Sequence, residues 1–92
     1  MAGTALITGA SAGLGRALAV ELHGRGFDLA LCARRLGRLE ALRGELGRSG
    51  GGGGRVEIAE LDVADHRRVG EVFRALHDRL GGLDVVVVNA GI

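Results

Sequence analysis

The residues with the clearest chemical meaning form a glycine-rich segment near the N-terminus. Gly9, Gly13 and Gly15 follow a short apolar run and precede a segment in which apolar residues have helical spacing. A strand that passes through such a turn into a helix directs backbone N–H groups and the positive end of the helix dipole at one point. Because that point attracts anions, the segment predicts a phosphate-binding turn.

The spacing of these glycines is G-x-x-x-G-x-G, which differs from the dinucleotide-binding pattern G-x-G-x-x-G. We expect Gly9 to permit a tight exit from the strand and Gly13 to let the backbone approach a pyrophosphate. Gly15 would allow the helix to pack closely on the strand. The alternative is a glycine-rich turn that binds nothing, but the strand–turn–helix context favours a ligand.

A pair of arginines, Arg34 and Arg35, ends the second apolar run. Dinucleotide folds that use NAD place an acidic residue there, which accepts hydrogen bonds from the ribose 2′-hydroxyl. A guanidinium can instead pair bidentately with a 2′-phosphate. This position therefore favours NADP over NAD, the alternative being that both arginines merely solvate a helix entry. Arg16 could add positive potential or be plain surface charge.

The elements that would position these residues alternate between short apolar runs and segments of helical period. The predicted strands are Thr4–Thr8, Asp28–Ala33, Arg55–Asp62 and Asp84–Val88, and the predicted helices are Gly13–Arg25, Leu36–Leu46 and Asp65–Leu80. Parallel strands need crossover connections, so this alternation predicts an α/β doubly wound parallel sheet. The predicted sheet is partial, with about four strands and three helices in the order βαβαβαβ.

Individual residues refine these boundaries. Asp65 stands where a helix N-cap belongs, and Gly81 with Gly82 stands where a helix ends. Val85–Val88 is typical of a parallel strand that is covered on both faces. Gly50–Gly54 is predicted to be a flexible surface loop. The apolar face of the first helix is predicted to consist of Leu14, Ala17, Leu18 and Leu22.

Small and polar residues follow the third and fourth predicted strands as well. Leu61-Asp62-Val63 ends the third strand, and Asn89-Ala90-Gly91 follows the fourth. Ligands of doubly wound sheets bind at the carboxyl ends of the strands, near the point where the strand order reverses. Asp62 taken alone could equally be a helix-capping or loop residue. All four strand ends together predict one cofactor cleft.

These segments together resemble the N-terminal half of a short-chain dehydrogenase/reductase, over essentially the whole chain and in the order of that family. The resemblance implies a Rossmann-like fold and hydride transfer between NADP(H) and an alcohol or carbonyl substrate in the complete enzyme. One departure is Val88, which stands where the family often has the first of two asparagines. NADP(H) is the implied partner, and the complete enzyme is expected to be a homo-oligomer.

The resemblance also assigns roles within the cleft. Ser11 and the backbone of Leu14 would contact the cofactor phosphates or ribose, and Arg34 with Arg35 would hold the 2′-phosphate. Asp62 and the backbone of Val63 would meet the adenine, while the segment after the fourth strand would line the adenosine ribose. The predicted cofactor-binding residues are Thr8, Gly9, Ser11, Gly13, Leu14, Gly15, Arg34, Arg35, Asp62, Val63, Asn89, Ala90 and Gly91.

Catalytic residues are not predicted in this chain. The family relies on a serine, a tyrosine and a lysine in the half that follows, whereas these 92 residues contain no tyrosine and all twelve basic residues are arginine. No metal site is predicted either. The single cysteine, Cys32, is expected to be a buried, inert thiol. The three histidines, His23, His66 and His77, are expected at solvent-exposed or capping positions.

Composition argues against other classes of function. A net charge of +1 disfavours a general nucleic-acid binder. The longest apolar run, Val85–Val88, is too short to span a bilayer. The N-terminal segment lacks the pattern of a signal peptide, so a cytoplasmic location is the expectation.

Three hypotheses remain for residues 1–92. The chain is the cofactor-binding half of an NADP-dependent oxidoreductase truncated after its fourth strand, a nucleotide-binding module without turnover, or an inactive fragment. An uncovered fourth strand favours truncation, because a self-sufficient module should cover that strand and protect its edge. The isolated chain is accordingly expected to be marginally stable or self-associating.

Overall fold

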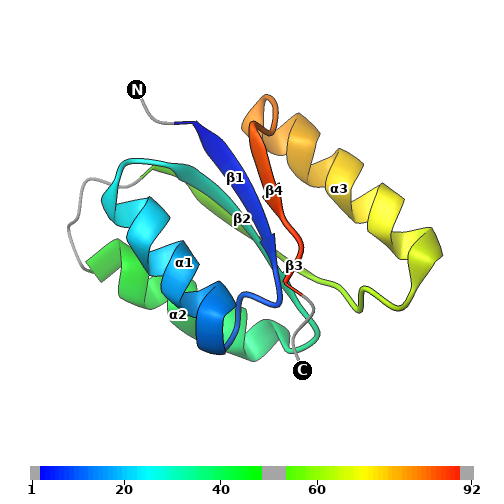
Figure 1. Cartoon of the computed structure of the whole chain (residues 1–92), viewed down its shortest axis with the longest axis horizontal. Coiled ribbons are helices and arrows are strands. Elements are labelled where there is room, and N and C mark those ends of the chain that lie inside the picture. The colour runs from blue at the N-terminus through cyan, green and yellow to red at the C-terminus, as the bar shows by residue number, and fades with distance from the viewer. Residues whose placement is uncertain (1–2, 49–53, 90–92) are drawn as a thin grey trace.

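The structure is a computed structural model that describes residues 3–48 and 54–89. Helices and strands alternate along the described chain (Figure 1). The elements are β1 (Thr4–Thr8), α1 (Gly13–Gly24), β2 (Asp28–Ala33), α2 (Leu36–Arg48), β3 (Val56–Glu60), α3 (His66–Leu80) and β4 (Val85–Val87). All seven predicted elements are confirmed, and their ends differ from the predicted ones by at most two residues.

The strands form one sheet in the order β3-β2-β1-β4, and each neighbouring pair is parallel. The chain moves outward from β1 through β2 to β3 and then returns to the other side of β1 for β4. The strand order therefore reverses between β1 and β4, and the carboxyl ends of these two strands mark the point at which doubly wound sheets bind ligands. The predicted α/β doubly wound sheet is confirmed.

Helices cover both faces of the sheet: α1 and α2 lie on one face and α3 lies on the other (Figure 1). Side chains of a strand alternate between faces, so Leu29 and Leu31 of β2 pack under α1 and α2, whereas Ala30 and Cys32 face α3. Burial on both faces explains why β1 and β2 are continuous apolar runs.

The start and end of α3 follow the predicted signals. Asp65 is the N-cap, and its side chain accepts a hydrogen bond from the N–H of Arg68 at 3.4 Å. Gly81 ends the helix in the left-handed region, with φ of 76°. Of the predicted loop Gly50–Gly54, only Gly54 is among the described residues.

The buried face of α1 differs in part from the predicted one. Leu18 and Leu22 pack against the core as predicted, but Leu14 is 68% exposed and Ala17 is exposed too. The fully buried residues of the helix are Gly15, Ala19 and His23. The helix packs so closely on the sheet that small residues occupy the contact. A pattern of large apolar residues does not predict such a contact. The prediction for His23 was also wrong, because this side chain is only 5% exposed.

The valines of β4 and the residue after it are partly exposed. Val85 and Val86 are 42% and 46% exposed, and Val88 beyond the strand is 68% exposed. Within residues 3–48 and 54–89, β4 forms one edge of the sheet and pairs with β1 alone. The valines are typical of a strand covered on both faces, and the expectation that residues 1–92 leave this strand uncovered is confirmed for the described part of the chain.

Burial of Cys32 gives a pH-dependent prediction. This thiol is fully buried, and desolvation raises its pKa from 9.0 to about 12. Between these two values the unfolded chain releases a proton that the folded chain retains, so the free energy of unfolding should fall as pH rises, by at most about 1.4 kcal/mol per pH unit. Denaturant titrations between pH 8 and about pH 10.5 would measure this slope. In Cys32→Ala this contribution should be absent, and equal slopes in both proteins would contradict the prediction.

Candidate functional site

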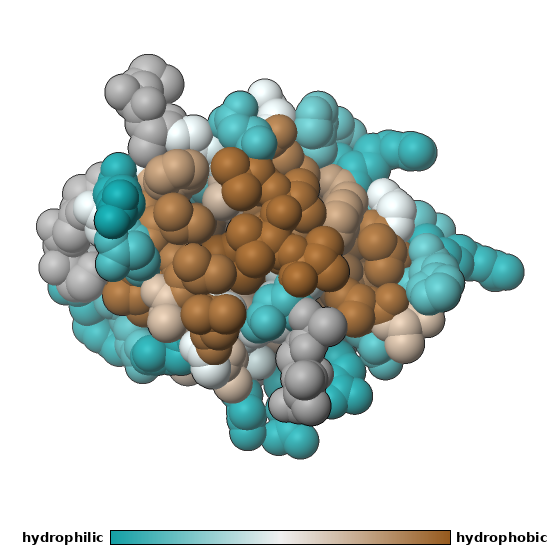
Figure 2. All heavy atoms as spheres, viewed as in Figure 1, coloured by the Kyte–Doolittle hydropathy of each residue, from teal (hydrophilic) through white to brown (hydrophobic). Residues whose placement is uncertain are grey.

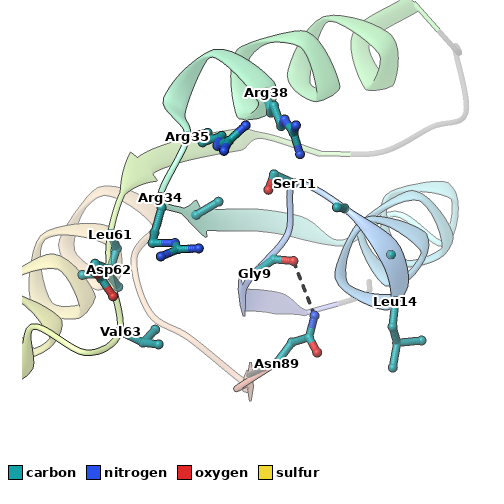
Figure 3. Close-up of a pocket in the computed structure, with 13 residues that line it drawn as sticks. Gly9, Ser11, Leu14, Arg34, Arg35, Arg38, Leu61, Asp62, Val63 and Asn89 are labelled. Carbon is teal, nitrogen blue, oxygen red and sulfur yellow. Dashed lines mark hydrogen bonds between the residues drawn. The ribbon is translucent and has the colours of Figure 1, made fainter. Parts of the chain in front are cut away.

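A cleft of roughly 590 Å³ opens at the carboxyl ends of the strands, beside the point where the strand order reverses (Figure 3). Residues from the ends of β1 and β2 and from the segments after β3 and β4 line it together. The lining residues are Gly9, Ser11, Ala12, Gly13, Leu14, Ala33, Arg34, Arg35, Arg38, Leu61, Asp62, Val63 and Asn89. The structure thus brings together residues predicted from all four strand ends.

Two of the predicted site residues that the structure describes, Thr8 and Gly15, are not among those that line the cleft. Both of them are buried. Ala90 and Gly91 fall outside the described residues. Conversely, Arg38 lines the cleft although the sequence analysis did not select it. Its spacing from Arg34, four residues along the chain at the start of a helix, was the signal that could have found it.

The glycine turn needs its glycines for different reasons. Gly9 and Gly13 have φ of 62° and 57°, in the left-handed region that side-chain-bearing residues rarely adopt. A Cβ on Gly13 would meet nothing within 4 Å, so backbone conformation alone requires glycine there. A Cβ on Gly15 would overlap the carbonyl oxygen of Gly9 and lie 2.9 Å from Asn89 Nδ2. Gly15 therefore permits the close contact between α1 and the turn.

Hydrogen bonds tie this turn to the segment after β4. The N–H of Asn89 donates to Thr8 Oγ1 at 3.0 Å, and Asn89 Nδ2 donates to the carbonyl of Gly9 at 3.4 Å (Figure 3). Thr8 is 1% exposed. Its hydroxyl thus holds the turn against Asn89, while direct contact of Thr8 with a cofactor stays a prediction.

Positive charge gathers on one wall of the cleft. Arg34 and Arg35 leave the end of β2 as predicted, and Figure 3 shows them around the same opening as Arg38 of α2. Arg16 does not add to this charge, because its guanidinium pairs with Glu45 of α2 on the outer surface. The interpretation of Arg16 as surface charge is therefore the one that the structure supports.

Asp62 and Val63 form the wall opposite α1. Asp62 Oδ1 accepts a hydrogen bond from the N–H of Ala64 at 3.0 Å, which fixes the carboxylate in a local turn. The side chain also lines the cleft, so Asp62 is a loop-ordering residue and a cleft residue at once. Val63 is 41% exposed and offers apolar surface beside it.

The lining of this site suits the binding of an anionic ligand. Backbone groups of the turn and the guanidinium groups suit phosphates. Within residues 3–48 and 54–89, no group of three His, Cys, Asp or Glu side chains is placed to hold a metal ion. Cys32 is buried, as predicted, and its raised pKa makes it a poor nucleophile.

Comparison with known proteins identifies this arrangement. A family model described as short chain dehydrogenase matches residues 3–92. The chain belongs to the short chain dehydrogenase family. The family resemblance predicted from the glycine turn and the strand ends is therefore confirmed.

Relatives of this short chain dehydrogenase sequence include an uncharacterized oxidoreductase of Mycobacterium tuberculosis, which is 53% identical over 87 residues. These residues are 95% of this chain and 34% of that protein. Farnesol dehydrogenase of Aedes aegypti is 38% identical over 96% of this chain and 35% of that protein. The chain spans about a third of the length of the curated relatives that it matches.

Solved structures of the family have the same arrangement of elements. An alcohol dehydrogenase from the archaeon Thermococcus sibiricus, complexed with 5-hydroxy-NADP, superimposes with a TM-score of 0.88 and 43% identity. The match covers 97% of this chain and 37% of that one. A β-ketoacyl-ACP reductase from Bacteroides thetaiotaomicron superimposes with a TM-score of 0.90 and 31% identity, over 99% of this chain and 41% of that one. Within the described ranges of the present chain, no helix has the length and apolarity needed to cross a membrane.

Proposed function

We propose that this chain is the cofactor-binding part of an NADP-dependent oxidoreductase, and that NADP(H) is preferred over NAD(H). The observation that carries the proposal is the end of β2, where Arg34 and Arg35 line the cleft in place of an acidic residue. Two relatives lend support: the alcohol dehydrogenase complexed with 5-hydroxy-NADP, and an NADPH-dependent pterin aldehyde reductase of Arabidopsis thaliana, 41% identical over 88 residues.

Each part of the cleft suits a part of this cofactor. The glycine turn and the first turn of α1 would hold the pyrophosphate, and Arg34 with Arg35 would hold the 2′-phosphate. Asp62 and Val63 would lie along the adenine. Asn89, with Ala90 and Gly91 after it, would line the adenosine ribose. In the complete enzyme the cofactor supplies or accepts the hydride that is exchanged with an alcohol or carbonyl substrate.

The residues of this chain would bind the cofactor and orient it without transferring hydride themselves. The hydroxyl proton of an alcohol needs a general acid or base during the reaction. These 92 residues contain no tyrosine and no lysine, which are the family's residues for that step. A nucleotide-binding module without turnover is thus the second candidate function. The cytoplasmic location and the homo-oligomeric complete enzyme remain proposals.

Titration of the 92-residue chain with NADPH and NADH, followed by fluorescence or calorimetry, tests the cofactor preference. We expect NADPH to bind about tenfold more tightly or better, because a charge-assisted pair contributes about 1.4 kcal/mol or more. Arg34→Asp should remove most of this preference by repelling the 2′-phosphate. Arg74→Asp makes the same charge change on the exposed surface of α3 and should preserve the preference. Equal affinities of the unmutated chain for both cofactors would contradict the proposal.

A further inference from the structure

The apolar pattern of β4 does not fix the position of this strand along β1. The three residues of β4 lie opposite residues 5–7 of β1, and a fourth valine, Val88, follows them directly. The register of a strand is normally set by its pattern of apolar and polar residues. Because four identical side chains stand in a row, a slip by one residue would place residues 86–88 opposite the same three partners.

A carboxylate joins the two strands just before the valines begin. Asp84 Oδ2 accepts a hydrogen bond from the N–H of Thr4 at 2.8 Å, and the N–H of Asp84 donates to the carbonyl of Thr4 at 2.8 Å. Gly3 leaves room for this carboxylate, because a Cβ on Gly3 would lie 2.6 Å from Asp84 Oδ2. Both hydrogen bonds of this Asp84 clamp go to one residue of β1, so the clamp forms in one register only.

Asn89 joins the other end of the valine run to the end of β1. Its N–H donates to Thr8 Oγ1 at 3.0 Å, and its Nδ2 donates to the carbonyl of Gly9 at 3.4 Å. A strand rises by about 3.3 Å per residue, so a slip by one residue would carry Asn89 away from both acceptors. The place of Asn89 in the cleft therefore depends on the register of β4.

Packing holds β4 less firmly than it holds the inner strands. Figure 1 shows β4 beside β1, and in the described part of the chain it pairs with no other strand. Val85 and Val86 are more than two-fifths exposed, whereas the residues of β2 from Leu29 onward are buried. Side-chain packing therefore opposes a slip of β4 weakly, and the hydrogen bonds at its two ends carry more of that task.

A second clamp of the same kind joins β2 to the start of β3. Asp28 Oδ1 accepts a hydrogen bond from the N–H of Arg55 at 2.7 Å, and a Cβ on Gly54 would overlap this oxygen. The strand that follows differs from β4, because Val56 and Ile58 pack under α2 while Glu57 between them faces the opposite side and pairs with arginines. This alternation sets the register of β3 without the clamp.

We infer that Asp84 determines the register of β4 and is thereby a positioning residue for Asn89 at the opposite end of the strand. Asp84 is not among the residues that line the cleft, so it acts through β4 and not by contact with a ligand. Without its carboxylate, β4 shifts or detaches, and the amide of Asn89 loses Thr8 as its acceptor. This role does not depend on which cofactor the cleft binds.

Hydrogen exchange of the Asn89 amide, followed by NMR on the 92-residue chain at low protein concentration, tests this role. Asp84→Ala should raise the exchange rate about fivefold or more, because loss of a hydrogen bond to a charged acceptor favours local opening. Asp84→Asn keeps an acceptor oxygen at the same position and should restore most of the protection. Gly3→Ala should also raise the rate, since its Cβ displaces an intact carboxylate, and it keeps the test decisive if Asp84→Ala does not fold.

Asp28→Ala is the matched control, because it removes the equivalent clamp between β2 and β3. It should raise the exchange rate of the Arg55 amide and leave that of Asn89 unchanged. An equal rise at Asn89 in Asp28→Ala and Asp84→Ala would overturn the inference in favour of a general loss of stability. Unchanged exchange at Asn89 in both Asp84→Ala and Gly3→Ala would overturn it as well, and so would a failure of Asp84→Asn to restore protection.

Discussion

Replacement of Gly15 by alanine is expected to abolish cofactor binding and to lower the free energy of unfolding, although alanine is the better helix former. The added Cβ would overlap the carbonyl oxygen of Gly9 and lie 2.9 Å from Asn89 Nδ2. Both neighbours are held in place, Gly9 by its position in the turn and Asn89 by its hydrogen bonds to Thr8 and Gly9. We expect a loss of about 3 kcal/mol, because such overpacking forces backbone shifts.

Gly24→Ala provides the control within the same helix. A Cβ on Gly24 would meet nothing within 4 Å, so this substitution should be neutral or raise the free energy of unfolding by up to about 1 kcal/mol. Denaturant unfolding of both variants measures the difference, and titration with NADPH measures binding. A Gly15→Ala variant that is as stable as the unmutated chain and binds NADPH normally would show that the turn can move aside.

The fold could be predicted because its strongest signals are local. β1 and β2 are apolar on both faces, and α3 has a capping residue, a regular apolar stripe and a left-handed glycine at its end. The alternation of strands and helices then leaves few possible topologies. The strand ends that predicted a cleft, including Asp62 and Asn89, meet in space because parallel strands bring their carboxyl ends to one edge.

The features that could not be predicted depend on contacts between distant segments. α1 buries Gly15 and Ala19 and exposes Leu14, because the close approach to the sheet and the turn selects small residues. A hydrophobicity pattern ranks leucine above glycine, so it finds Leu18 and Leu22 on the packed face but misses the small residues at its centre. Arg38 was not predicted to line the cleft for a related reason. The apolar spacing of α2 indicates which side of the helix faces the core, but it does not indicate that the first turn borders a cleft.

The second large effect concerns the outer edge of β4, where we expect the 92-residue chain to self-associate. Figure 2 shows apolar side chains gathered over β1 and β4 on the face in view. Val86 is 46% exposed, and in the described part of the chain no strand pairs with the outer edge of β4. An edge strand with neutral apolar side chains is a template for pairing with another chain, and a lysine on the edge opposes such pairing.

Val86→Lys is therefore expected to raise the concentration of half-association by about a hundredfold, because each of two copies loses the burial of a valine, worth ~1.5 kcal/mol. Sedimentation velocity over a concentration series measures this shift. Val20→Lys is the matched control, since Val20 is 45% exposed on α1, away from the sheet edge. Val86→Lys should favour the monomer while Val20→Lys leaves association unchanged. A monodisperse monomer before any substitution, or the same shift in both variants, would show that β4 does not direct self-association.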